Sequence, residues 1–125
     1  MLTDTTFSID LLLERADRQP GPAHRFIASH RAHRLRASII TWGEVAEGFA
    51  DHAELERLFR GIRVLMLPPQ IAWEASRIQR ELADAGVRIG ENDAWIAGTA
   101  RAWGFRLVTR DGAFRRVARL TVVGY

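Results

Sequence analysis

Two acidic residues in the last third of the chain stand where a helix begins or a strand ends. Asp93 follows Asn92, a good helix N-cap residue, and lies in the first turn of a helix predicted by the apolar spacing. Asp111 follows the β-prone run 105–109, in a turn-like Arg-Asp-Gly sequence. Ligands of parallel sheets bind where strands end and helices begin, so we expect both carboxylates to face one crevice.

Two further acids occupy equivalent positions nearer the start. Asp4 follows a minimal strand at 1–3, and Glu44 follows a predicted strand at 36–40, where a helix opens. Each has a sufficient structural explanation by itself: Asp is favoured just before a helix, and Thr41-x-x-Glu44 matches the capping box. The joint placement of the four acids, not any one of them, predicts a functional site.

Four carboxylates at one sheet edge would carry a charge of about −4, which is unfavourable unless their pKa values rise or a cation binds. Oxygen ligands without Cys or His favour Mg²⁺, with Mn²⁺ as a possible substitute, over zinc. Three histidines, His24, His30 and His33, lie in Arg-rich polar surroundings that do not direct them to a common point. We interpret them as solvated side chains.

Composition describes one globular domain that spans residues 1–125. The chain has no Cys, no basic segment before an apolar run at its start, and no apolar run of membrane-spanning length. We therefore expect a cytoplasmic protein without a membrane partner. All 18 residues of the Lys and Arg class are Arg, which favours a polyanionic partner, although genome composition alone would explain many solvated arginines.

Short apolar strands alternate with helices along the chain. The predicted strands are 1–3, 36–40, 62–67, 105–109 and 120–123, and the predicted helices end near residues 17, 34, 49, 59, 85 and 103. This order predicts an α/β fold, a three-layer α/β/α sandwich around a mostly parallel, short-stranded central sheet. We interpret Trp42 and Trp95, one turn from the acids, as core or dimer residues rather than base-stacking groups.

Four short motifs in the right order resemble those of the PIN domain family, and within it the VapC-type toxins of toxin–antitoxin pairs. They are Asp4-Thr5 with Ile9 to Leu12, Ile40-Thr41-x-x-Glu44, Gly90-x-Asn92-Asp93-x-x-Ile96-Ala97, and Leu107-Val108-Thr109-Arg110-Asp111-x-x-Phe114. The resemblance runs from end to end, although the strand before Asp4 is shorter than is usual in the family.

The resemblance implies a PIN-like fold and a metal-dependent endoribonuclease toxin that cleaves structured RNA by a metal-activated water. It also implies a homodimer and a cognate VapB-type antitoxin. Carried over residue by residue, the catalytic and Mg²⁺-binding quartet is Asp4, Glu44, Asp93 and Asp111. Thr5 and Thr109 would support it.

The RNA would be bound first by arginine. Arg110, beside Asp111, is the best-placed candidate, with Arg15 and Arg101 behind it.

The sequence leaves three other interpretations. A catalytically inactive PIN fold could bind RNA or protein only, but such domains usually lose some of the acids. A haloacid-dehalogenase-like phosphatase would need a second acid where Thr6 stands, and a Lys that the chain lacks. A receiver domain is disfavoured for the same reasons.

Overall fold

The sheet at the centre of the molecule is parallel throughout. The computed structural model describes residues 1–125 and contains five strands in the order β3-β2-β1-β4-β5. The strands are β1 Leu2–Thr3, β2 Leu35–Ser38, β3 Ile62–Leu65, β4 Leu107–Val108 and β5 Val122–Val123. Every neighbouring pair is parallel. The predicted α/β class and sheet are confirmed, with strands shorter than the apolar runs suggested.

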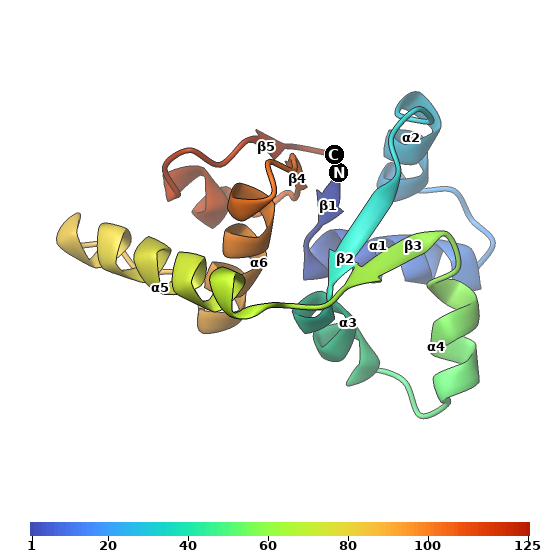
Figure 1. The fold of residues 1–125 in the computed structure, drawn as a ribbon. Helices are drawn as coiled ribbons and strands as arrows, with labels where there is room; N and C mark the ends of the chain where they lie inside the picture. The colour runs from blue at the N-terminus through green and yellow to red at the C-terminus, as the bar shows by residue number, and fades with distance from the viewer.

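Six α-helices and one 3₁₀ helix connect the strands (Figure 1). They are α1 Thr5–Ala16, α2 Pro22–Ser29, α3 Ile39–Ala46, α4 His52–Leu58, α5 Pro69–Asp84, α6 Glu91–Ala102 and η1 Gly112–Arg116. The apolar face expected on α5 is buried through Ile71, Ala75, Ile78 and Leu82. None of the helices is long and apolar enough to cross a membrane.

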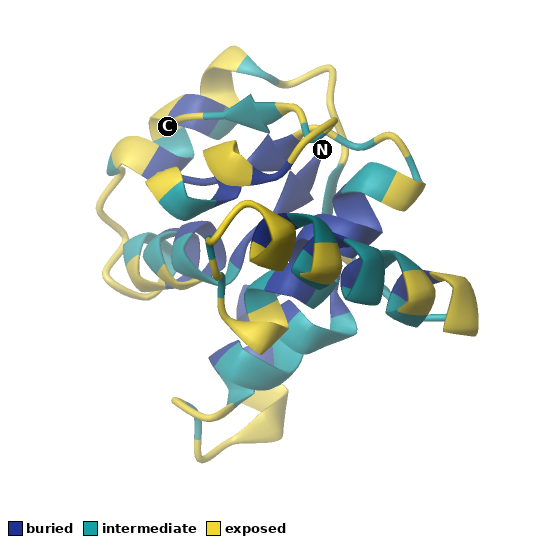
Figure 2. Cartoon of the chain, turned by 90° about the vertical axis from the view of Figure 1, so that its left-hand side faces the viewer, coloured by how far each residue is buried: buried dark blue, intermediate teal, exposed yellow.

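Two apolar cores, one on each face of the sheet, make up the three layers. The first packs α1, α2 and α4 against the sheet, and the second packs α5, α6 and η1 against the other face. Successive strand residues alternate between them, because side chains along a strand point to opposite faces: Leu107 lies in the second core and Val108 in the first. Figure 2 shows the buried residues in the central strands and on the inward sides of the helices.

Two helix starts differ from the sequence prediction. α3 begins at Ile39, inside the run expected to be a strand, because Ser38 caps it and its hydroxyl accepts a hydrogen bond from the Thr41 backbone N–H. α6 begins at Glu91 with Gly90 at the N-cap position, so Asn92 is not its cap. The capping-box explanation for Glu44 is therefore wrong, and the side chain of Asn92 is free for another role.

Candidate functional site

Asp4 is the most buried of the four acids. It follows β1 and caps α1, with its Oδ1 accepting a hydrogen bond from the Phe7 backbone N–H at 2.7 Å, and its residue surface is only 2% exposed. Its Oδ2 accepts a hydrogen bond from the Thr109 hydroxyl. Burial raises the pKa of Asp4 to about 6, the two hydrogen bonds oppose the rise, and the charges of Asp111 and Asp93 add to it.

Thr109 connects the ends of two neighbouring strands. Besides donating to Asp4, its hydroxyl oxygen accepts the backbone N–H of Asp111 at 2.9 Å. Asp111 then caps η1 through a 2.8 Å bond from the Ala113 backbone N–H, with its side chain at the surface. Thr109 therefore lies beside Asp4 and Asp111, and its hydroxyl fixes where the Asp111 turn leaves β4.

Asp93 lies in the first turn of α6, as predicted, and is half-buried. Burial raises its pKa, the charges of Asp111 and Glu44 raise it further, and a hydrogen bond from the Gly90 backbone lowers it. A Cβ atom at Gly90 would lie 3.0 Å from Oδ2 of Asp93. Residue 90 therefore has to be small for this carboxylate to keep its position.

Glu44 lies in the second half of α3 and contacts two other helices. Its Oε2 accepts a hydrogen bond from the Thr5 hydroxyl at the start of α1, and its Oε1 accepts one from Asn92 Nδ2 of α6 at 2.9 Å. Thr5 is thus beside the acids as expected. Asn92 is a residue whose role the sequence reading missed, because it was assigned to backbone capping.

The four carboxylates lie on the side of the sheet where the parallel strands end, near enough for their charges to affect one another in pairs. The charge of Asp111 acts on both Asp4 and Asp93, and that of Glu44 acts on Asp93. No group of three or more His, Asp or Glu side chains, however, is close enough together to hold a metal ion as the side chains stand. Hydrogen bonds from Phe7, Thr109, Thr5, Asn92 and Ala113 hold three of the acids in these positions.

Arg110 is exposed beside Asp111 and is oriented by residues from two distant segments. Its Nη1 lies 3.1 Å from Oδ2 of Asp10, and its guanidinium lies 5.8 Å from the ring centroid of Tyr125. The Tyr125 hydroxyl donates to the same Asp10 oxygen at 2.6 Å. Asp10 was not among the predicted site residues, since nothing in its local sequence indicates a partner 100 residues away.

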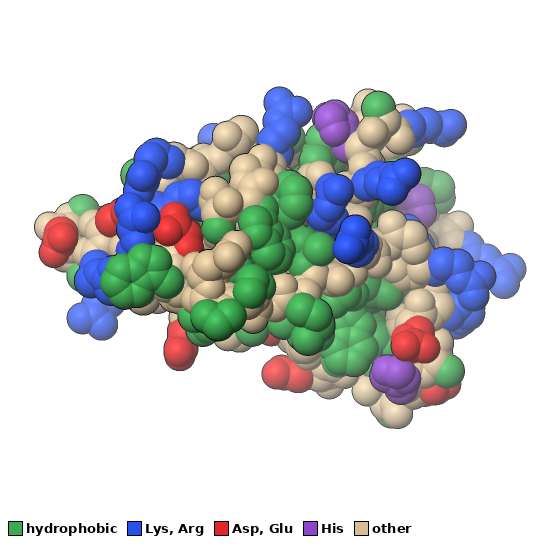
Figure 3. Space-filling view, in the orientation of Figure 1, with side chains coloured by type: hydrophobic (Ala, Val, Ile, Leu, Met, Phe, Trp, Pro, Cys, Tyr) green, Lys and Arg blue, Asp and Glu red, His purple; other side chains and the backbone are tan.

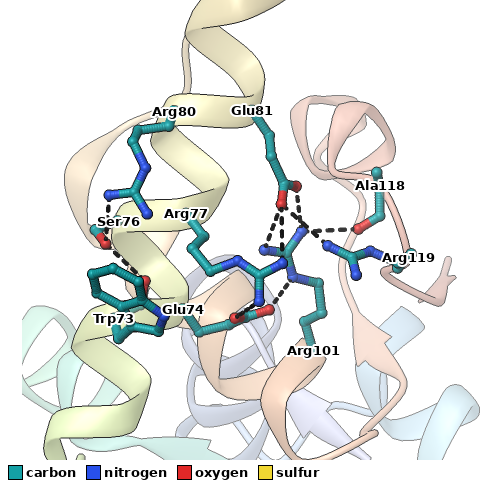
Figure 4. Close-up of polar contacts among 9 residues, drawn as sticks. All are labelled: Trp73, Glu74, Ser76, Arg77, Arg80, Glu81, Arg101, Ala118 and Arg119. Carbon is teal, nitrogen blue, oxygen red and sulfur yellow. Dashed lines mark hydrogen bonds and ion pairs between the residues drawn. The ribbon is translucent and has the colours of Figure 1, made fainter.

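Arg101 is not available for RNA, and this part of the sequence prediction is wrong. Its side chain is 5% exposed and forms ion pairs with Glu74 at 2.5 Å and Glu81 at 2.6 Å (Figure 4). It also donates to the Ala118 carbonyl at 3.2 Å. The group joins α5, α6 and the segment after η1, so its role is structural.

Arg15 does not lie with the acids either. Its Nη1 donates to the carbonyls of Leu58 and Arg60 at 2.5 and 3.1 Å, so it binds the C-terminal end of α4. The two tryptophans are half-buried as expected for core-associated residues, with Trp42 packed against the first core. His24 pairs with Glu14, and His30 stacks on Phe26.

The family model of the PIN domain matches residues 1–120. The chain belongs to the PIN domain family. Comparison with curated proteins gave no significant match.

Solved structures of toxin–antitoxin complexes share the fold. VapBC2 from Rickettsia felis, bound to a DNA fragment from its promoter, is 18% identical with a TM-score of 0.84, over 98% of this chain and 96% of that one. VapBC-1 from nontypeable Haemophilus influenzae is 27% identical with a TM-score of 0.78, again over 98% and 96%. VapC20 from Mycobacterium tuberculosis, a Sarcin-Ricin loop cleaving toxin, is 15% identical with a TM-score of 0.63, over 96% and 98%. This PIN domain is therefore similar to VapC toxins along its whole length.

Proposed function

We propose that this PIN domain is the Mg²⁺-dependent endoribonuclease toxin of a VapBC-type module and cleaves phosphodiester bonds in structured RNA. The observation that supports the proposal is the placement of Asp4, Glu44, Asp93 and Asp111 on the side of the sheet where the strands end, with the pKa of Asp4 and of Asp93 raised. A bound cation would relieve this electrostatic cost. The similarity to an RNA-cleaving VapC supports the choice of substrate.

The donor chemistry of the four residues fits a hard divalent ion, since all the available ligands are carboxylate or hydroxyl oxygens. Their present spacing does not form a cluster of three, so the side chains would have to approach one another to coordinate an ion together. Asp4 and Asp93 are the proposed principal ligands, with Glu44 and Asp111 acting directly or through water. When bound, Mg²⁺ supplies an activated water and neutralises charge on the attacked phosphate, and Mn²⁺ could replace it.

Hydrogen bonds within the protein would hold the acidic side chains in position for the ion and the RNA. Thr109 holds Asp4 and the Asp111 turn together, while Thr5 and Asn92 hold Glu44 between α1 and α6. Arg110, oriented by Asp10, presents an exposed guanidinium next to Asp111 and could bind an RNA phosphate.

A VapB-type antitoxin and a second copy of the chain are the proposed protein partners. Support for the antitoxin comes from the similarity to VapBC complexes. Met66 and Trp73 are 70% and 62% exposed, which leaves large apolar side chains for a partner to cover.

An inactive PIN domain that only binds RNA or protein is the second candidate. It is favoured by one observation, the lack of any three acidic side chains close enough to hold a metal as they stand.

The discriminating experiment incubates purified protein with a mixture of structured RNAs, with Mg²⁺ or with EDTA. We expect cleavage with Mg²⁺ only, and a loss of at least about 10²-fold in rate for Asp4→Asn and for Asp93→Asn. Asp84→Asn, an exposed acid at the far end of α5, is the matched control and should cleave like wild type. Wild-type rates in the Asp4→Asn protein would overturn the assignment, and binding without cleavage in wild type would favour the inactive alternative.

A further inference from the structure

A second charged region lies at the opposite edge of the sheet from the acids, where β2 and β3 begin. A groove of about 280 Å³ opens there, and its polar lining consists of Arg15, Arg34, Arg36, Arg63 and His33. No carboxylate contributes to it. Arg34 and Arg63 are fully at the surface, so their guanidinium groups face solvent.

The groove arginines have no acidic partners. All ion pairs of arginine in the molecule involve Arg57, Arg77, Arg101, Arg110 and Arg119. Around Arg101 the positive charges are balanced by Glu74 and Glu81, as Figure 4 shows. The charge at the groove is therefore uncompensated. Figure 3 shows arginine side chains along the side formed by α2, β2 and β3 with no acidic side chain among them, while acidic side chains on this face lie over α5, where arginines accompany them, and along the lower margin near α3 and α4.

Two of the guanidinium groups are held in place by the fold. Arg15 is bonded to the carbonyls of Leu58 and Arg60. Arg36 donates to the Arg34 carbonyl at 3.3 Å and lies over the Phe105 ring at 4.7 Å from its centroid. Fixed arginines lose less side-chain entropy when they bind an anion, and each keeps further N–H groups free.

The positive charge at this edge also acts on a neighbouring group. Burial lowers the pKa of the Met1 ammonium, and the charges of Arg36 and Arg106 lower it further. Arg106 therefore adds to the positive field at this end of the strands, beyond the arginines that line the groove.

We propose that this groove binds the phosphate backbone of the RNA, as an anchoring surface separate from the carboxylates. This inference rests on the proposed function, because it takes the substrate RNA as the ligand. Forked guanidinium groups match phosphate oxygens, and several unpaired arginines suit a chain of phosphates better than a single anion. A membrane surface is disfavoured, since the exposed large apolar residues Ile9, Leu13, Met66 and Trp73 do not line the groove.

The geometry allows one RNA to contact both regions. β2 is four residues long, so its two ends, one at the groove and one at the acidic edge, are only about 10 Å apart. β3 is an edge strand, and the exposed Arg60 lies two residues before its start in the chain. A folded RNA held in the groove could thus pass along the outermost strand, β3, from the groove at the strand starts to the acids at the strand ends. The separate anchor would contribute affinity without repulsion from the carboxylates.

The test measures the affinity of a fluorescent RNA hairpin across a salt series, in EDTA so that binding is separated from metal-dependent cleavage. The variant is Arg34→Gln/Arg63→Gln, chosen because neither side chain makes a hydrogen bond or ion pair in the fold. Its control, matched in the change of charge, is Arg80→Gln/Arg88→Gln, two exposed arginines on α5 and just after it. Arg80 also donates to the Ser76 hydroxyl and lies over the Trp73 ring, so the thermal unfolding of this variant is compared first. Thermal unfolding of both variants checks that they remain folded.

We expect Kd for the hairpin to rise roughly tenfold or more in the groove variant, and the slope of log K against log salt to become shallower by roughly 1 to 2. The control should change Kd by less than about twofold. Equal effects in the two variants would overturn the proposal. The proposal would also be overturned if duplex DNA, poly-glutamate or phosphatidylserine vesicles bound more tightly than the hairpin and lost this binding in the groove variant. Each of these results would assign the groove to another ligand. If the hairpin binds through the groove but wild type cleaves no RNA with Mg²⁺, the proposed function fails and this inference stands.

Discussion

Asn92 of α6 donates a hydrogen bond from Nδ2 to Oε1 of Glu44 in α3, over 2.9 Å. The contact joins two helices that start at the same edge of the sheet, and it exists because neither residue caps its own helix: Ser38 and Gly90 occupy those positions. Glu44 receives its second hydrogen bond from Thr5 in α1. One carboxylate therefore sets the relative positions of three helix segments that border the candidate site.

Removal of the Asn92 amide should weaken catalysis with little effect on folding. In Asn92→Ala, Glu44 keeps only its Thr5 partner and is freer to move. We expect the single-turnover cleavage rate in Mg²⁺ to fall roughly tenfold, since a hydrogen bond to a charged group is worth about 1.5 kcal/mol or more. Glu91→Ala, at the exposed neighbouring position of α6, is the control. Equal rates in the two variants would show that the Asn92 contact is dispensable.

The sequence predicts the architecture well because local signals and topology agree. α5 has apolar residues at spacings of four, three and four along the chain, and the helix face they predict is the buried one. Asp4, Asp93 and Asp111 lie at strand ends or in first helical turns as expected. The starts of α3 and α6 were missed because Ser38 and Gly90 are also plausible cap residues, and a choice between neighbouring caps depends on tertiary contacts.

The contacts of the arginines could not be predicted from the sequence. Position along the chain placed Arg110 correctly beside Asp111, but it could not show that Arg101 is buried between Glu74 and Glu81, or that Arg15 bonds to the end of α4. Those pairings depend on which helices pack together, and the partners are 20 to 45 residues away. The contacts of Asp10 with Arg110 and of Asn92 with Glu44 could not be predicted for the same reason.

The buried carboxylate of Asp4 should make the metal-free protein less stable as the pH rises. Burial raises its pKa from 3.8 to about 6, so the folded protein binds this proton more tightly than the unfolded chain does. Between about pH 4 and 6 the unfolded chain therefore holds fewer protons, and the free energy of unfolding falls with rising pH, by about 2–3 kcal/mol in total.

The measurement is urea unfolding in EDTA at several pH values from 4.5 to 7, for wild type and Asp4→Asn. Contributions from other groups, such as Glu14 and Glu81 with their lowered pKa values, are common to both proteins and cancel in the difference. Asp4→Asn should become relatively more stable as the pH rises. Parallel curves for the two proteins would contradict the predicted shift.

Mg²⁺ should stabilise the folded protein, because it offsets the repulsion between Asp93, Asp111 and Glu44. At a concentration about 100 times Kd, a ligand that binds only the native state adds about 2.7 kcal/mol. Thermal unfolding at constant ionic strength should show a larger Tm increase at pH 7.5 than at pH 5, where Asp4 is mostly protonated. The increase should be much smaller in Asp93→Asn than in Asp84→Asn, and equal increases in the two would place the ion elsewhere.

Loss of Arg101 should destabilise the fold without a direct effect on RNA affinity. Arg101→Met leaves Glu74, whose side chain is 14% exposed, without its closest cation, and we expect a loss of about 3 kcal/mol in the free energy of unfolding. Arg77→Met, whose side chain is 40% exposed in the same cluster, should cost less than about 1 kcal/mol. Urea unfolding measures both. If Arg101 contacted RNA directly, folded Arg101→Met protein would instead show a shallower slope of log K against log salt for RNA binding than wild type does.

The close packing of α6 on α5 should control where Asp93 lies. A Cβ atom at Gly98 would be 3.0 Å from the backbone nitrogen and 3.2 Å from the Cα of Ala75, so Gly98→Ala must push the two helices apart. We expect it to cost about 1–3 kcal/mol of unfolding free energy. Gly43→Ala is the matched control, because a Cβ there meets nothing within 4 Å and alanine favours a helix by about 0.5–1 kcal/mol over glycine.

A shift of α6 away from α5 should also move the candidate site, because Asn92 and Asp93 lie in α6. A shift of about 1 Å in a catalytic group can cost about 10²-fold in rate. Cleavage measured well below the Tm should therefore fall in the order wild type, Gly98→Ala, Gly98→Ser, because the added hydroxyl forces a wider separation. If both variants lose stability but cleave at the wild-type rate, the position of α6 is not what sets the geometry of Asp93.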